Sequence, residues 1–118
     1  MHPRLTRLLP IAAVAVMSAA VMLRRGAPPA PLALAAVSGP AVVWNACAAP
    51  RCLTVYVAPW CGVCRSSTEF ISAIVSFLNA RGVPARVVVG KDSSQAVADY
   101  ARAFGPGTLL DPEGRVPL

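Results

Sequence analysis

The sequence predicts an α/β domain with elements in the order β-α-β-α-β, behind an apolar helix at the N-terminus. Three observations indicate this class. Short runs of β-branched and aromatic residues alternate with longer stretches whose apolar residues recur at helical spacing. Gly, Pro, Asp or Ser stands at most of the junctions between these runs. An uncharged apolar stretch, Leu8–Leu23, precedes them all.

The N-terminal segment has the pattern of an export signal or a membrane anchor. Two arginines precede the apolar run Leu8–Leu23, and the pair Arg24 and Arg25 follows it. A basic start and an apolar core shorter than the about 20 residues that span a bilayer are typical of a signal peptide. The arginine pair after the core is instead typical of a retained anchor. We therefore expect residues 1–25 to be either a signal peptide or a membrane anchor.

The next segment is rich in proline. Residues 26–40 read GAPPAPLALAAVSGP, with four prolines and two glycines. Proline removes backbone donors and stiffens the chain, so we expect a semi-extended linker here. A folded domain then begins near Ala41. Residues 41–118 are few for a domain, so the core should be marginal.

Charge and composition exclude several classes of function. The formal net charge is +6, but four of the eleven basic residues lie in the first 25 positions. The basicity therefore belongs to the targeting segment, and no basic stripe with interleaved aromatics suggests a nucleic-acid partner. His2 is the single histidine, so no Ser/His/Asp set exists. We expect no cofactor and no metal.

The first predicted strand is Leu53–Ala58, LTVYVA, which Pro59 ends. Its residues are apolar on both faces, as is typical of a central strand covered by helices. The predicted helix Cys64–Ala80 follows, and Gly82 is a plausible stop. One face of this helix is apolar and consists of Phe70, Ile71, Ile74, Val75 and Leu78.

The second half of the domain repeats this alternation. Val83–Gly90 is predicted as a second buried strand, parallel to the first, and residues 92–94 offer N-caps for a second helix. Thr108–Asp111 is predicted as a short third strand, and a type I turn over Asp111–Gly114 follows it. The apolar face of the second helix consists of Val97, Tyr100, Ala101 and Phe104.

Two cysteines stand at the junction between the first strand and the first helix. Cys61 should lie at the helix N-terminus, where free N–H groups and the helix dipole favour a thiolate. Cys64, one turn later, is within reach of the first sulfur. We therefore expect Cys61 to attack a disulfide and Cys64 to resolve the mixed disulfide. Trp60 should cover the site with an apolar face, and Gly62 should let a partner backbone approach.

The run WCGVC, Trp60 to Cys64, resembles the active-site motif of the thioredoxin superfamily, and the resemblance extends over residues 53–114. It implies a thioredoxin-like fold and a thiol-disulfide oxidoreductase that acts on protein thiols and disulfides together with a redox partner protein. With the N-terminal segment, the chain is most similar to exported oxidoreductases, either periplasmic or tethered to the inner membrane. Val63 would face the partner, but proline is common at this position. Val55 stands where thioredoxins carry a buried aspartate.

A third departure concerns the cis-proline that closes the site in relatives. Pro106 is one candidate, and Thr108–Asp111 would then be the strand that follows it. Alternatively, GTLLDPEGRV resembles the strand and Asp-Pro-x-Gly segment that precedes the cis-proline in tethered relatives, and the chain is C-terminally incomplete. Gly105 favours the second interpretation, because a β-branched residue usually precedes that proline.

Two other functions remain as alternatives. Cys47, Cys52, Cys61 and Cys64 form C-x4-C-x8-C-x2-C, which could be a four-cysteine structural zinc site. The apolar strand between the two pairs is unlike a zinc-ribbon loop. The domain could also be a redox-inactive binding module, although a disulfide across so short a loop stabilises little. Cys47 and Cys52 are expected to pair as a local disulfide or to act as a second redox pair.

Overall fold

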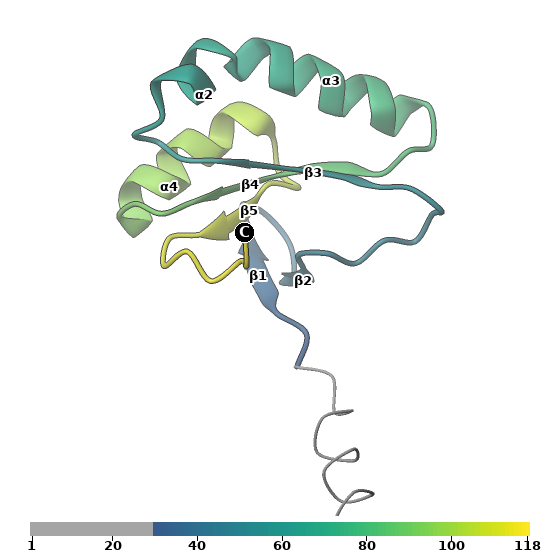
Figure 1. The fold of residues 1–118 in the computed structure, drawn as a ribbon, viewed down its shortest axis with the longest axis horizontal. Helices are drawn as coiled ribbons and strands as arrows, with labels where there is room; N and C mark the ends of the chain where they lie inside the picture. The colour runs from purple at the N-terminus through teal and green to yellow at the C-terminus, as the bar shows by residue number, and fades with distance from the viewer. Residues whose placement is uncertain (1–29) are drawn as a thin grey trace, which may run out of the picture. The chain divides into compact units, whose positions relative to one another are not determined.

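The computed structural model describes residues 30–118, which form a mixed α/β domain with a curled five-stranded sheet (Figure 1). The expected apolar helix around Leu8–Leu23 lies outside the described residues. Within residues 30–118, no helix has the length and apolar character needed to cross a membrane. The elements in chain order are β1 (Ala33–Ala36), β2 (Val42–Val43), β3 (Leu53–Val57), α2 (Gly62–Ser66), α3 (Thr68–Ala80), β4 (Ala85–Gly90), α4 (Ser94–Ala101), the 3-10 turn η1 (Arg102–Phe104) and β5 (Leu109–Asp111).

The strands lie in the order β2-β1-β5-β4-β3. β3 pairs parallel with β4, and β4 pairs parallel with β5, so the predicted β-α-β-α-β alternation and the parallel pairing of its first two strands are confirmed. Val55 stands opposite Val87 in the β3–β4 ladder. β1 runs antiparallel to both β5 and β2. The sheet is therefore mixed, with its parallel part nearest the cysteine pair.

The helix predicted over Cys64–Ala80 begins two residues earlier and is divided in two. α2 ends at Ser66, α3 begins at Thr68, and Ser67 between them has φ −101° and ψ 4°, outside the helical region. The Thr68 hydroxyl donates to the carbonyl oxygens of Cys64 and Arg65. These bonds add to those that the Ser67 N–H makes to the carbonyl oxygens at the end of α2. α2 is thus a separate short turn that carries the cysteine pair.

A strand lies inside the expected linker. β1 falls within residues 26–40, and its register places Ala35 opposite Leu110 and Ala36 opposite Leu109. Leu34 in the same strand is 3% exposed and packs with core residues of the neighbouring strands. The compact unit of the chain consequently begins at Pro31, not near Ala41.

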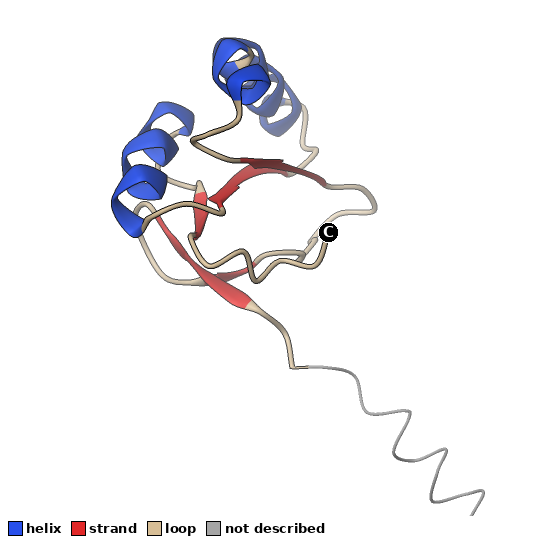
Figure 2. Ribbon diagram, turned by 60° about the vertical axis from the view of Figure 1, so that its left-hand side comes forward, coloured by secondary structure: helices blue, strands red, loops and turns tan. Residues whose placement is uncertain are grey.

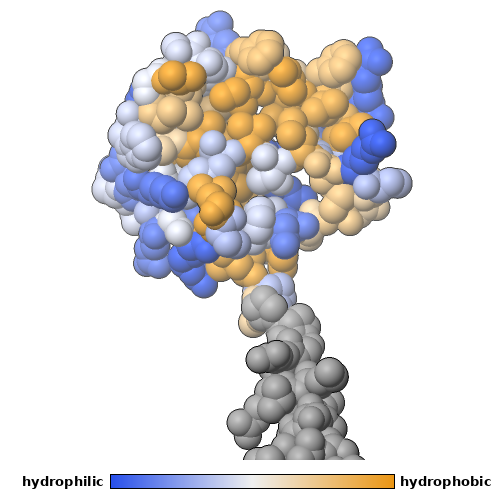
Figure 3. All heavy atoms as spheres, in the orientation of Figure 1, coloured by the Kyte–Doolittle hydropathy of each residue, from blue (hydrophilic) through white to orange (hydrophobic). Residues whose placement is uncertain are grey.

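The expected central position of the first predicted strand is wrong, because β3 lies at the edge of the sheet. Four of its five residues are only half-buried. α3, which packs over β3 and β4, has no buried residue, and Phe70 and Phe77 on it are 68% and 53% exposed. Figure 3 shows the apolar surface that gathers over this part of the domain. One side of β3 therefore presents unpaired backbone groups next to exposed apolar side chains.

Each face of the sheet carries its own core cluster. The cluster on the side of α3 and α4 consists of Val57, Val87 and Val89 of the sheet and Val97, Tyr100 and Ala101 of α4. The opposite face holds Leu34, Val88, Leu109 and Val116. The coil after β5 crosses this second face, and all the described helices lie on the other side (Figure 2). The central strands β4 and β5 are the best buried part of the domain.

We expect stability to depend on β4 and not on the outer face of α3. Val89→Ala should lower the free energy of unfolding by about 2 kcal/mol, because it removes buried methyl groups and leaves a cavity. Phe77→Ser should change it by less than about 1 kcal/mol, because its ring is half exposed. Denaturant melts of the full chain in one mild detergent would measure both. Equal losses would mean that the outer face of α3 is packed against another part of the chain.

Candidate active site

The cysteine pair lies at the end of β3 that carries the short helix α2. Cys61 is the N-cap residue of α2, with φ −79° and ψ 107°, and its sulfur accepts a hydrogen bond from the Cys64 N–H at 3.2 Å. No acidic residue stands in the first turn of α2. The sulfur of Cys61 is therefore at a helix N-terminus, as predicted.

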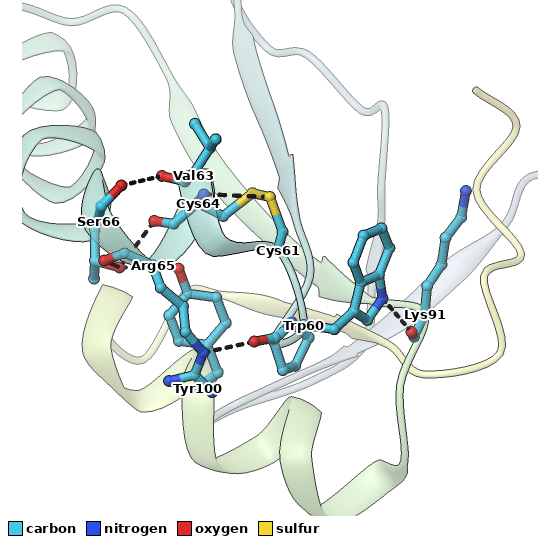
Figure 4. Close-up of a disulfide and its surroundings, with 10 residues drawn as sticks. Trp60, Cys61, Val63, Cys64, Arg65, Ser66, Lys91 and Tyr100 are labelled. Atoms are coloured by element: carbon cyan, nitrogen blue, oxygen red, sulfur yellow. Dashed lines mark hydrogen bonds between the residues drawn. A yellow bond between two sulfur atoms is a disulfide. The ribbon is translucent and has the colours of Figure 1, made fainter.

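Cys61 and Cys64 are joined as a disulfide with Cα atoms 5.2 Å apart (Figure 4). This separation is within the usual range for disulfides. Both cysteines are half-buried, whereas Gly62 and Val63 between them are exposed. Val63 is 77% exposed, so the loop that joins the two sulfurs is open to a partner.

Trp60 lies beside the disulfide and is bonded to Lys91, a residue that was not predicted to belong to the site. Its indole N–H donates to the carbonyl oxygen of Lys91 at 2.8 Å, and the ring is 66% exposed. Lys91 follows β4 and has φ 59°, a left-handed conformation that is uncommon for lysine. Figure 4 shows the indole standing between Cys61 and the Lys91 side chain. Trp60 thus forms a fixed apolar wall next to the sulfur atoms.

Arg65 connects α2 to its surroundings. Its Nε donates to the carbonyl oxygen of Pro59, and its guanidinium lies 5.0 Å from the centre of the Tyr100 ring. The Tyr100 hydroxyl in turn meets the Thr68 hydroxyl at 2.9 Å. These contacts join the loop before Cys61 to α3 and α4. They also leave the charge of Arg65 on the side of the disulfide opposite Lys91.

Pro106 is not brought to this site. It is exposed, and no peptide bond between residues 30 and 118 is cis. Its carbonyl oxygen accepts from the Ser38 N–H at 3.1 Å, which places Pro106 where the chain enters β5 beside β1. The interpretation of Pro106 as the cis-proline of the site is therefore wrong.

A buried carboxylate lies near the cysteine pair, at the carboxyl ends of the parallel strands. Asp111 at the end of β5 is 1% exposed and accepts from the Tyr56 hydroxyl at 2.9 Å. It also accepts from the backbone N–H groups of Arg115 and Val116 at 2.8 and 3.0 Å. A side chain at Gly90 would collide with the Tyr56 hydroxyl and the Asp111 carbonyl oxygen, so this contact requires glycine. Sequence reasoning missed the cluster because its members come from three strands.

A small cavity of about 190 Å³ opens beside the disulfide. Its walls are mainly apolar and come from the end of β3, including Tyr56, from Trp60 and the two cysteines, and from Lys91. Leu118 also lines the cavity and is 80% exposed. The cavity is adjacent to the sulfur atoms and open to solvent.

The second cysteine pair is also bonded and lies elsewhere. Cys47 and Cys52 form a disulfide, with Cα atoms 5.9 Å apart, in the loop between β2 and β3. Arg86 fixes this loop by donating to the carbonyl oxygens of Val43 and Ala46. The two pairs stand at opposite ends of β3, whose residues each advance about 3.3 Å. Within residues 30–118, no three His, Cys, Asp or Glu side chains converge as a metal site would require.

The Tyr56 hydroxyl should give stability that depends on pH. Burial, together with the neighbouring Asp111 carboxylate, raises the pKa of Tyr56. The folded state therefore keeps a proton that the unfolded chain loses near pH 10, so this stabilisation is present below about pH 10 and is lost above it. Tyr56→Phe should cost about 1 kcal/mol at pH 7.

Urea melts at several pH values would test this expectation. The difference in unfolding free energy between wild type and Tyr56→Phe should shrink as the pH rises from about 9 to 11. If the difference in unfolding free energy stays constant between about pH 9 and 11, the hydrogen bond from the protonated Tyr56 hydroxyl to Asp111 does not supply this stabilisation.

Comparison with known proteins adds no relative. No family model matches the chain, and no curated protein matches it significantly.

Proposed function

We propose that the chain is a thioredoxin-like thiol-disulfide oxidoreductase that exchanges electrons with protein partners through Cys61 and Cys64. The observation that carries the proposal is the position of the Cys61 sulfur. It caps the N-terminus of α2, and Cys64 lies one turn later within disulfide distance. The exposed indole of Trp60 beside it offers an apolar surface for a partner.

The exchange has two steps. In the dithiol form, the Cys61 thiolate attacks one sulfur of a partner disulfide, the partner S–S bond breaks, and one partner thiolate leaves. The thiolate of Cys64 then attacks the Cys61 sulfur, which releases the second partner thiolate and forms the Cys61–Cys64 disulfide. Two electrons pass to the partner, whose thiolates take up the protons that the dithiol lost. The reverse sequence oxidises a partner dithiol.

The local electrostatics favour Cys61 as the attacking group. The N–H of Cys64 points at its sulfur, and the first turn of α2 has no carboxylate that would repel a thiolate. Cys64 lies further into the helix and packs against the core under α3. A nucleophile at the helix start and a resolving cysteine behind it divide the two steps between the sulfurs.

The positions of the four cysteines favour exchange over the alternative of a zinc site. Four thiolates bind one zinc ion at about 2.3 Å each, so they have to converge on a point. Here the five residues of β3 separate the pair Cys47–Cys52 from the pair Cys61–Cys64. Neither Cys47 nor Cys52 lies at the end of a described helix, and their loop is held by Arg86, as suits a structural disulfide.

Export of the domain is part of the same proposal. Two intramolecular disulfides fit an oxidising compartment, because the cytosol keeps most thiols reduced. The apolar run Leu8–Leu23 preceded by arginines supplies an export signal or an anchor. We propose a periplasmic domain, either free or tethered to the inner membrane.

We expect the two active-site cysteines to behave differently on substitution. The full chain should reduce a protein disulfide in the presence of a dithiol, and Cys61→Ser should abolish this activity. Cys64→Ser should accumulate a mixed disulfide with the partner, because the resolving thiol is missing. Gel shifts under non-reducing conditions measure this. A mixed disulfide that forms with Cys61→Ser instead would reverse the assignment.

The pair Cys47 and Cys52 provides the matched control. Replacing both with serine should leave the exchange rate within about twofold and lower the free energy of unfolding by about 2 kcal/mol, since the bond closes a short loop. Loss of exchange in this variant would mean that the second pair takes part in the reaction.

The location can be tested with reporter fusions. A reporter that is active only outside the cytoplasm, fused after Leu118, should be active, and a cytoplasmic reporter at the same position should be silent. Removing residues 1–25 should reverse both results. Activity from the cytoplasmic fusion of the full chain would contradict export.

A further inference from the structure

The cavity beside the disulfide is placed to receive part of a partner. Its walls include both sulfur-bearing residues and the ring of Trp60, and it holds about 190 Å³. This volume suits one side chain and not a whole small molecule, since ligand pockets usually exceed about 300 Å³. A residue next to the reacting cysteine of a partner would enter it when the sulfur atoms meet.

Lys91 is the one charged residue on the wall of this cavity. Its backbone is fixed from both sides, because its N–H donates to the Asp111 carbonyl oxygen at 3.1 Å and its own carbonyl oxygen accepts from Trp60. The side chain passes close to Gly114, where an added Cβ would stand 3.0 Å from the Lys91 Cγ. The ammonium group ends 5.8 Å from the centre of the Tyr56 ring. The backbone of Lys91 is therefore fixed at the cavity, and its side chain runs between Gly114 and the Tyr56 ring.

No carboxylate neutralises this ammonium group within the described part of the chain, where the one ion pair joins Arg102 to Asp99. Asp92, the next residue in the sequence, and Asp111, whose carbonyl oxygen accepts from the Lys91 N–H, both have other partners for their carboxylates. The Asp92 carboxylate accepts from the Ser93 N–H at 2.7 Å, at the start of α4. The Asp111 carboxylate accepts from Tyr56 and two backbone N–H groups.

The disulfide thus lies between two positive charges. Arg65 is on its α4 side, where the guanidinium faces Tyr100, and Lys91 is on the side of Trp60 (Figure 4). None of the residues that line the cavity is acidic. An anionic group that enters the cavity would meet an unpaired cation above apolar walls.

We propose that this cavity is a specificity subsite, in which Lys91 selects a partner with an aspartate or glutamate next to the reacting cysteine. The inference rests on the proposed exchange function and names the chemistry of its partner. The methylene groups of the acidic side chain lie against Trp60, and the carboxylate pairs with the Lys91 ammonium. Since Lys91 is exposed, the ion pair should change the rate by about threefold and not by orders of magnitude.

The test compares three peptide disulfides that differ only in the residue beside one cysteine, which is Glu, Gln or Lys. The reduced full chain, in one mild detergent, should reduce the Glu peptide about threefold faster than the Gln peptide and the Lys peptide more slowly than both. Salt near 1 M should remove these differences. Cys61→Ser supplies the background rate for each peptide.

Four variants assign the effect to this side chain. Lys91→Arg should keep the preference for Glu, Lys91→Gln should remove it, and Lys91→Glu should reverse it. Arg81→Gln removes another exposed cation, which lies 4.1 Å from the Phe77 ring at the far end of α3, and should leave the preference intact. Each variant changes one exposed side chain, and a melting temperature close to that of the wild type would confirm that the variant folds.

The outcomes separate this inference from the proposed function. Equal reduction of all three peptides by the wild type would overturn the subsite and leave the exchange function standing. A preference for Glu that persists in Lys91→Gln would overturn it as well. Failure of the reduced chain to act on any of the peptides above the Cys61→Ser background would overturn the exchange function itself.

Discussion

The parallel pairing of β3, β4 and β5 is the constraint on which the site depends. The carboxyl ends of parallel strands lie on the same side of a sheet, so the residues that follow these strands are brought together. Cys61 follows β3, Lys91 follows β4, and Asp111 ends β5. The register places Gly90 opposite Asp111, and the missing side chain at Gly90 lets the Tyr56 hydroxyl reach the carboxylate. A shift of the register by one residue would separate all of these groups.

The open edge of β3 changes how the cysteine pair is held. A central strand would be fixed by hydrogen bonds on both sides, but β3 has a ladder only with β4. The loop that follows it is instead fixed by two side chains, Trp60 bonded to the Lys91 carbonyl and Arg65 bonded to the Pro59 carbonyl. The first bond joins the loop to the residue after β4, and the second joins α2 to the loop. The position of the sulfur atoms therefore depends on these two side chains as much as on the sheet.

Local sequence chemistry was sufficient to predict β3, β4 and β5, the parallel pairing of the first two, the helical segments and the place of Cys61 at a helix start. It was not sufficient for β1, because Ala33–Ala36 has low strand propensity and becomes a strand by pairing with residues far along the chain. It also misplaced β3, since an apolar run has the same periodicity at the centre and at the edge of a sheet. Lys91 was missed for a related reason. Nothing near it in the sequence shows that its carbonyl oxygen meets Trp60, 31 positions away.

The two disulfides differ in backbone context, and under the proposed function this difference separates a structural cysteine pair from a reactive one of similar spacing. Both close short loops, with separations of five and three residues. Cys47 and Cys52 stand in a loop that Arg86 holds through carbonyl groups, and neither caps a described helix. Cys61 caps α2, so the N–H groups and dipole that would stabilise its thiolate are present before any partner arrives. Because the helix terminus favours the thiolate, it lowers the cost of opening the Cys61–Cys64 bond, and no equivalent group offsets that cost at Cys47–Cys52.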